Sequence, residues 1–229
     1  MIWPFKRSIE SRRKSALKHC SNPLMQDFLS ADIADKNRDW RDISLVSLDL
    51  ETTGLNPEKD QILSIGLVEI HHGSIHLDSA WHQIIQVEND IPEASAVIHH
   101  ITDDIMAQGE RIKSIIPQLL ERLNGKVMLV HYANVEQNFL NAACQNLYGS
   151  PFIIQTIDTL KLAHRQMSAR NHTIQTNDLR LFNLRKHYEL PEYTAHNALY
   201  DAIATAELFM AMAAESNPKG PQRIGDYLN

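Results

Sequence analysis

The sequence predicts an α/β fold with a mixed five-stranded sheet and helices on both of its faces. Residues 43–87 show the apolar pattern and the turn residues of three strands in an antiparallel meander. Further along the chain, helical periodicity alternates with short apolar segments, and parallel strands need helical crossovers of this kind. The chain has 229 residues, which is enough for one sizeable domain. These observations together predict a sheet covered by helices on both sides.

The meander accounts for the first three strands, which we expect at residues 43–51, 61–72 and 73–87. The first reads ISLVSLDLE and is apolar enough for a core strand. The sequence LNPEKD then forms a turn, and His72-Gly73 marks the hairpin between the second and third strands.

The second half supplies the remaining strands and the helices. Strands four and five are expected at residues 126–133 and 151–158. Asn124-Gly125 and Gly149 are C-cap signals for the helices before them, and Pro191 ends another helix. The polar segment 168–178 is interpreted as a loop. The expected helices are 91–102, 111–125, 134–149, 159–167, 178–190 and 196–215.

Three regions follow from this pattern: an N-terminal helical and linker extension at residues 1–42, a main domain at 43–217 and a C-terminal tail at 218–229. The basic segment FKRSIESRRKSALKH in the extension is interpreted as a helix packed on the domain or as a solvated arm. A role at a nucleic acid or a membrane surface is the alternative.

Composition excludes several classes of protein. The formal net charge is −6, so no overall positive field attracts a nucleic acid, and local basic residues or metal ions would have to do so. Cys20 and Cys144 form no CxxC pattern, which argues against a disulfide framework or a zinc site. We expect no signal peptide and no membrane-spanning segment, and therefore a cytoplasmic protein.

Two acids, Asp49 and Glu51, follow one another at alternate positions of the first strand. Side chains two residues apart point to the same face of a strand, with Cα atoms about 6–7 Å apart. Two like charges at that distance repel each other unless a cation lies between them. A metal site is therefore one interpretation, and a strand end whose acids face water is the other. Ligands in such sheets bind at the C-terminal ends of the strands, where both acids fall.

Three further residues are candidates for the same site. Glu136 lies in the first turn of a helix, where the helix dipole favours an anion, as it would on any helix. Asp201 lies on an apolar helix and needs a partner, which a cation shared with Asp49 would provide. His196 would face away from Asp201 on one continuous helix, so the two converge only if the helix starts after His196, capped by Thr194 or Asn197.

Three segments, DLETTGL, HYANVEQNFL and HNALYDAIATAELF, resemble in this order and spacing the motifs of the DEDDh 3′–5′ exonucleases. The group that includes the proofreading epsilon subunit of bacterial DNA polymerase III is the most similar. The segments IPEASAVIHHIT and IDTLKLA add smaller matches, and the resemblance extends over residues 45–213. It implies an RNase H-like exonuclease fold for the main domain.

The resemblance also implies a role for each matching residue. Asp49, Glu51, Glu136 and Asp201 would hold two divalent cations, Mg²⁺ or Mn²⁺, and His196 would be the general base that takes a proton from water. A histidine must be neutral to act in this way, so the rate would rise with pH. Residues assigned to substrate binding are Thr52, Thr53, Gly54, Leu55 and His99. Basic residues expected to carry the upstream strand, or only to form a solvated face, are Arg165, Arg170, Arg180 and Lys186.

The second motif departs from the family, where it commonly reads His-Asn-Ala-x-Phe-Asp. Glu136 stands in place of the aspartate, Tyr132 in place of the asparagine and Val135 in place of the phenylalanine. His100 likewise replaces a glycine. A longer acid suits a ligand that acts through water better than one held to the tight geometry of Mg²⁺. Weaker activity or a shifted preference is therefore expected.

We expect an exonuclease that acts on the 3′ end of single-stranded DNA and releases 5′-mononucleotides. A 3′–5′ exoribonuclease of the same superfamily is one alternative, since the choice depends on accommodating a 2′ hydroxyl. A weakly active nucleic-acid-binding accessory module is the other. The resemblance allows a homodimer, and the sequence does not identify an interface.

Overall fold

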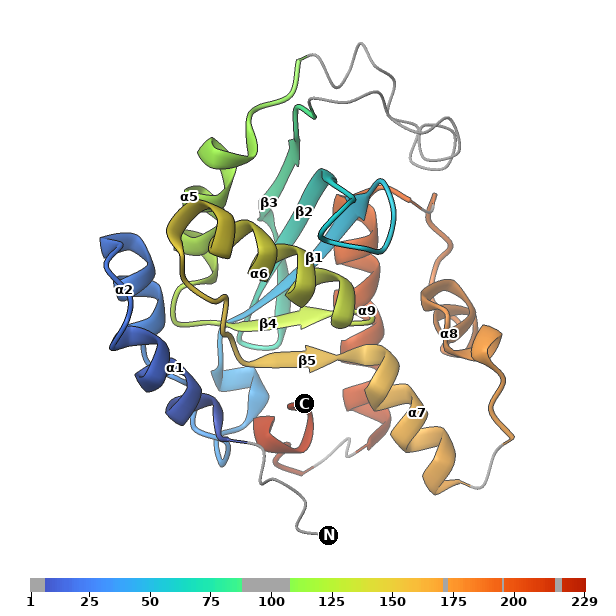
Figure 1. The fold of residues 1–229 in the computed structure, drawn as a ribbon. Coiled ribbons are helices and arrows are strands. Elements are labelled where there is room, and N and C mark those ends of the chain that lie inside the picture. The colour runs from blue at the N-terminus through green and yellow to red at the C-terminus, as the bar shows by residue number, and fades with distance from the viewer. Residues whose placement is uncertain (1–6, 88–107, 171–172, 195, 217–219) are drawn as a thin grey trace, which may run out of the picture.

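Five strands form one mixed sheet in the order β3-β2-β1-β4-β5 (Figure 1). The computed structural model describes residues 7–87, 108–170, 173–194, 196–216 and 220–229. Neighbouring strands β1, β2 and β3 are antiparallel, whereas β4 and β5 run parallel to β1. The predicted mixed five-stranded sheet is thus confirmed. The strands are β1 (Leu45–Thr52), β2 (Ile62–His71), β3 (Ser74–Ile84), β4 (Val127–Val130) and β5 (Thr156–Asp158).

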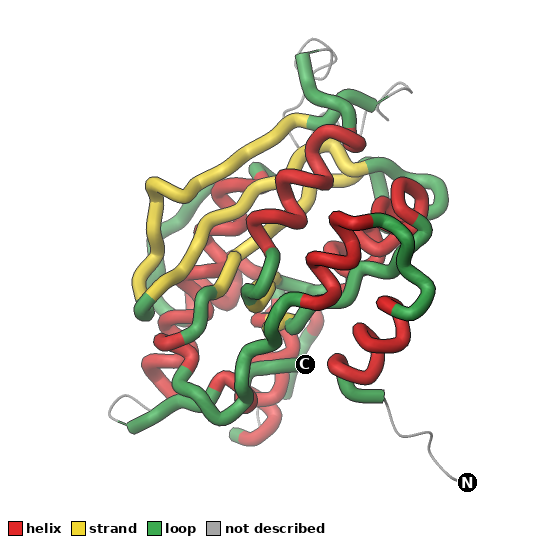
Figure 2. The backbone as a smooth tube through the Cα atoms, turned by 90° about the vertical axis from the view of Figure 1, so that its left-hand side faces the viewer, coloured by secondary structure: helices red, strands yellow, loops and turns green. Residues whose placement is uncertain are grey.

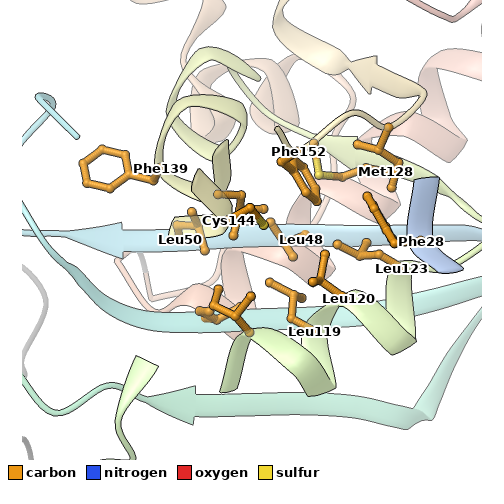
Figure 3. Packing of buried hydrophobic residues seen from close by; sticks show 14 of the residues in the cluster. Phe28, Leu48, Leu50, Leu119, Leu120, Leu123, Met128, Phe139, Cys144 and Phe152 are labelled. Carbon is orange, nitrogen blue, oxygen red and sulfur yellow. The ribbon is translucent and has the colours of Figure 1, made fainter. Parts of the chain in front are cut away.

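The β2–β3 hairpin turns at the predicted His72-Gly73 pair. Both residues have positive φ, 51° and 68°, as expected for the two-residue turn that matches the twist of a hairpin. Strand five is shorter than the predicted 151–158, because β4 offers ladder partners only from Met128 to Val130. The preceding Phe152 is instead buried and stacks on Phe28 with ring centroids 5.4 Å apart (Figure 3).

One face of the sheet is covered by α5 (Ile112–Leu123) and α6 (Asn134–Tyr148), with α1 (Ile9–Leu17) and α2 (Pro23–Ser30) beyond them (Figure 1). Leu48 and Leu50 of β1 point into this layer, where they meet Leu119 and Cys144 (Figure 3). The buried residues of α5 recur at helical spacing, as its predicted amphipathic pattern requires.

The other face is covered by α7 (Thr159–Ala169) and above all α9 (Ala198–Ser216), which crosses β1 and β2, and α8 (Leu181–His187) packs against α9 (Figure 1). Leu45 of β1 packs into this second core. Ser47 Oγ donates a hydrogen bond of 2.7 Å to the carbonyl of Ala202, which fixes α9 against β1. Viewed from the side, the strands form one twisted layer with helices on both sides (Figure 2). The predicted α/β architecture is confirmed.

The segment expected as one helix over 178–190 is divided. A 3-10 turn, η2 (Thr176–Leu179), precedes α8, and Arg180 between them is extended, with φ −67° and ψ 142°. Asp178 accepts a hydrogen bond from the amide of Gln175, so the turn satisfies its own polar groups and the helix starts afresh at Leu181. The expected helix at 91–102 lies outside the described residues.

The described parts of the N-terminal extension and of the C-terminal tail pack against the main domain. Arg13 of α1 is buried and donates to the carbonyls of Phe28 and Leu29 at the end of α2. Near the C-terminus, η3 (Ile224–Asp226) follows Gln222, whose side chain accepts a 2.6 Å hydrogen bond from the indole of Trp40. The domain boundaries at 42/43 and 217/218 stay a prediction. Among the described residues, no helix is both long and apolar enough to cross a membrane.

Candidate active site

The C-terminal end of β1 opens onto a cavity of about 380 Å³. Its lining brings together every described residue to which the sequence analysis assigned a catalytic or substrate-binding role. Asp49 and Glu51 lie on the same face of β1, as their spacing predicts. Residues of the lining are 49–55, His131, Val135, Glu136, His196 and Asp201.

Asp49 occupies the centre of a group of four carboxyl groups. Burial is the main cause that raises its pKa well above the ordinary value, and the charges of Glu51, Glu136 and Asp201 raise it further. Three acids from three different segments therefore face Asp49 closely enough to repel it. Such a group binds protons or cations strongly, because either one removes the repulsion.

Gly66 explains how Asp201 reaches this group. It pairs with Asp49 in the β1–β2 ladder, so the two positions lie side by side on the same face. A Cβ atom at Gly66 would lie only 2.1 Å from the carbonyl carbon of Ala198 and from the nitrogen of Leu199. The first turn of α9 therefore rests directly on the backbone of β2. This close approach places Asp201, in the same turn, next to Asp49.

His196 lies just before α9 rather than on it. Its φ is 66°, and Asn197 Oδ1 accepts a hydrogen bond from the amide of Tyr200 at the start of the helix. The amide of His196 donates to Asp201 Oδ2 at 3.1 Å. Ligand atoms of Glu51, His196 and Asp201 lie within 4.8 Å of one another. The structure thus adopts the arrangement in which His196 and Asp201 converge.

Glu136 enters the site from the first turn of α6. Its side chain is buried, and burial is the main cause that raises its pKa, with Asp158 and Glu51 adding repulsion. Among the described residues, its Oε2 atom has no hydrogen-bond partner. A buried carboxylate oxygen without a donor is costly unless a proton or a cation satisfies it. The longer side chain at this position therefore still reaches the group around Asp49.

Asp158 is also buried nearby, but its oxygens are occupied. It accepts hydrogen bonds from the backbone amides of Tyr132, Ala133 and Leu160, at 3.1, 3.2 and 3.1 Å. These bonds join the N-terminus of α7 to the β4–α6 turn. Asp158 thus fixes the turn from which Glu136 projects, and it does not belong to the candidate ligands.

The loop after β1 is held in one conformation. Thr52 Oγ1 donates to the carbonyl of Gly54 at 2.7 Å, and Asp60 accepts from the hydroxyl of Thr53 at 3.3 Å and from the amide of Asn56 at 2.8 Å. A Cβ at Gly54 would lie 2.5 Å from a carboxylate oxygen of Asp60. A side chain at this position would therefore have to displace the Asp60 carboxylate that holds the loop.

Leu55 and His99 are the other two residues that the sequence analysis assigned to substrate binding. Leu55 lines the cavity and its side chain is 77% exposed. His99 lies outside the described residues.

The four basic residues also separate into two pairs. Arg165 donates to the carbonyl of Asp226, and Arg170 forms an ion pair of 2.8 Å with Glu215, so both serve contacts within the domain. Arg180 and Lys186 are exposed, and neither forms an ion pair among the described residues.

The sequence analysis did not identify the residues that position the acids without being acids of the site themselves. Gly66, Ser47 and Asp158 are of this kind. An isolated glycine inside a strand signals a close backbone approach, and that signal was present at Gly66. Nothing local marked Ser47, because its partner is 155 residues away in the chain.

A mixed sheet with several carboxylates gathered at the end of its central strand offers the oxygen ligands that divalent cations prefer. The family model described as Exonuclease (RNase T) matches residues 46–209. This chain belongs to the exonuclease family. It is 30% identical over 172 residues to the DNA polymerase III subunit epsilon of Treponema pallidum, and the match covers 75% of this chain and 77% of that relative.

Two further comparisons agree. The PolC-type DNA polymerase III of Thermotoga maritima is 31% identical over 169 residues, which cover 74% of this chain but only 12% of that much longer relative. The nuclease domain of 3′hExo, a DEDDh family member bound to rAMP, has a TM-score of 0.65 at 16% identity and covers 83% of this chain and 99% of that one. The expected DEDDh type and RNase H-like fold are confirmed, and exonucleases of this type use divalent metal ions.

Proposed function

We propose that the protein is a 3′→5′ exonuclease that removes 5′-mononucleotides one at a time from single-stranded DNA. The observation that carries this proposal is the convergence of Glu51, Glu136 and Asp201 on Asp49. These acids come from β1, α6 and α9, so three separate elements are folded to bring repelling groups together. A protein keeps such a costly arrangement where it has a function.

Asp49, Glu51, Glu136 and Asp201 are the residues that would hold two divalent cations, Mg²⁺ or Mn²⁺. Oxygen ligands suit these hard cations, and Glu136 Oε2, which has no hydrogen-bond partner among the described residues, offers one more oxygen. When bound, the cations neutralise charge on the phosphate and lower the pKa of a coordinated water. They also offset the negative charge that would otherwise repel a nucleic acid from this acidic protein.

His196 is the proposed general base. It is exposed at the cavity, and its backbone is tied to Asp201, so the imidazole stays next to the acids while it remains open to water. An imidazole must be neutral to accept a proton, and histidine is the residue type that changes charge near neutral pH. His131, which also lines the cavity, is unsuited to this role. Burial lowers its pKa to about 4, and its nitrogens lie 2.8 Å from Thr159 Oγ1 and 3.0 Å from the carbonyl of Leu179.

The loop at Thr53-Gly54 is the proposed site for the terminal nucleotide. Asp60 fixes the loop, and Leu55 offers an exposed apolar surface for a base. A loop fixed in advance orders little on binding and so positions the terminal sugar for attack on the adjacent phosphate.

DNA is favoured over RNA by similarity, since two relatives at 31% and 30% identity are a PolC-type DNA polymerase III and a DNA polymerase III subunit epsilon. The structure of 3′hExo with rAMP keeps the exoribonuclease alternative open. The chain spans a small part of the PolC-type relatives, so a place in a replication complex is not part of this proposal.

The test uses 5′-labelled single-stranded DNA and RNA of one sequence, incubated with Mg²⁺, Mn²⁺ or EDTA. We expect a metal-dependent ladder that shortens from the 3′ end, faster on DNA, and no ladder with Asp201→Ala. A faster RNA ladder would select the exoribonuclease. If the folded wild-type protein cleaves neither the DNA nor the RNA substrate, the accessory-module alternative is supported instead.

A further inference from the structure

Tyr132, in the turn between β4 and α6, combines exposure with an unfavourable backbone. Its side chain is 44% exposed, and its φ is 72°, in the left-handed region that bulky residues rarely occupy. Asparagine is one of the few residues that adopt this conformation readily. An exposed ring gains little from the core, so packing does not account for the tyrosine at this position.

Hydrogen bonds to Asp158 hold the turn in this conformation. Asp158 accepts hydrogen bonds from the amides of both Tyr132 and Ala133, one on each carboxylate oxygen. The strained backbone is therefore part of a fixed support and not of a loose loop. Strain that the surrounding structure enforces is found mostly at functional positions.

The position of the turn relates Tyr132 to the cavity. His131 before it and Val135 and Glu136 after it all line the cavity. His131 Nε2 donates a hydrogen bond of 3.0 Å to the carbonyl of Leu179. Tyr132 directly follows His131, at one end of this hydrogen bond, and Arg180 directly follows Leu179, at the other end.

Arg180 adds a positive charge next to Leu179, at the other end of this hydrogen bond. It is exposed and extended between η2 and α8, and its guanidinium forms no ion pair within the described parts of the chain. The fixed loop with Leu55 forms a different part of the cavity rim, contributed by the β1–β2 connection. The cavity lining thus includes the exposed apolar side chain of Leu55, and the exposed Tyr132 and Arg180 directly follow the hydrogen-bonded residues His131 and Leu179.

We propose that Tyr132 and Arg180 form the binding site for the single strand upstream of the scissile phosphate, in which Tyr132 stacks on a base and Arg180 pairs with a phosphate. The inference rests on the proposed exonuclease function and names how its substrate is held. Stacking on an aromatic ring tolerates any base, and arginine binds the backbone regardless of sequence. Both suit an enzyme that moves along a strand.

The test compares two substrates of the wild-type protein and of Tyr132→Asn. One is an oligo-dT strand of about ten nucleotides, and the other is the p-nitrophenyl ester of thymidine 5′-monophosphate, which has no upstream nucleotide. For Tyr132→Asn we expect KM for the strand to rise by about 5- to 100-fold with kcat nearly unchanged, as loss of one stacked base predicts. The ester should be hydrolysed as by wild type, and the melting temperature should stay the same or rise, because asparagine accepts the positive φ.

Matched variants distinguish the loss of a stacking ring or a positive charge from a disturbance of the fold. Tyr132→Phe keeps the ring and should bind as wild type. Arg180→Gln should weaken strand binding, and the dependence of affinity on salt concentration should fall by the amount that about one phosphate contact contributes. Arg12→Gln, the same change on α1, should alter neither the affinity nor its salt dependence. Equal losses on both substrates with Tyr132→Asn, or an unchanged KM for the strand, would overturn the inference.

Binding is measured in parallel by fluorescence anisotropy of the labelled strand in an Asp201→Asn background. If wild type hydrolyses neither substrate but Tyr132→Asn still weakens binding, the proposed reaction fails while the strand site stands. If Tyr132→Asn does not weaken binding, the strand site is refuted whatever the activity.

Discussion

Replacing Gly66 by alanine should separate the acids of the site without touching any of them. The added Cβ would lie 2.1 Å from the backbone of Ala198 and Leu199, whereas carbon atoms in contact lie about 3.5–4.0 Å apart. Both neighbours are backbone atoms, which no side-chain rotation can clear. The start of α9 or the strand β2 must therefore move by more than about 1 Å.

That shift acts directly on the distance between Asp49 and Asp201, because Gly66 is the ladder partner of Asp49 and Asp201 is in the first turn of α9. A displacement of about 1 Å in a catalytic group lowers activity by roughly 10²-fold. Overpacking of this kind costs about 1–3 kcal/mol in the free energy of unfolding. For a chain of this size the melting temperature should fall by roughly 2–12 °C.

The assay measures the initial rate on 5′-labelled single-stranded DNA at a temperature where circular dichroism shows the variant to be folded. Gly125→Ala is the matched control. Its φ is 70° and a Cβ there meets nothing within 4 Å, so we expect a stability loss of about 1–2 kcal/mol with full activity. A folded Gly66→Ala protein that retains wild-type activity would refute the reasoning that this contact places Asp201.

Four further predictions concern the acids and the base. Asp49→Asn should abolish cleavage yet raise the stability of the metal-free protein by roughly 0.5–2 kcal/mol, because it removes a half-buried carboxylate that three other acids repel. The folded-state pKa of Asp49 is raised, so the wild-type protein in EDTA should lose stability as the pH rises through that pKa, and Asp49→Asn should lose less in thermal melts. Glu136→Gln should lower the rate by about 10- to 100-fold while Glu136→Asp stays within tenfold, and equal rates for both would show that its charge is not used. His196→Gln should lower kcat by about 10²- to 10⁴-fold and remove the rise of the rate with pH; an unchanged pH profile would exclude it as the base.

Much of the fold followed from local patterns. Alternation and turn residues predicted the meander, and the helical periodicity of the second half predicted the crossovers that make β4 and β5 parallel to β1. The order of the acidic motifs predicted the composition of the cavity. These features depend on neighbours within a few residues, which a sequence displays directly.

Features that depend on distant partners did not follow. The length of β5 is limited by the ladder that β4 offers, and the division of 178–190 depends on the extended backbone of Arg180. The role of Gly66 arises only where α9 crosses β2, more than a hundred residues later in the chain. Helix geometry alone did give the condition that His196 and Asp201 converge only if the helix starts after His196, and α9 starts at Ala198 although the expected helix 196–215 included His196.

Direct measurement of Mn²⁺ binding by calorimetry tests the central claim, that the acids around Asp49 form a divalent-cation site. The wild-type protein should bind two Mn²⁺ ions, and Asp49→Asn should bind neither with comparable affinity, since Asp49 faces all three other acids. Wild-type affinity and stoichiometry in Asp49→Asn would contradict the account, because the cations would then bind elsewhere and the convergence of four carboxylates would need another explanation.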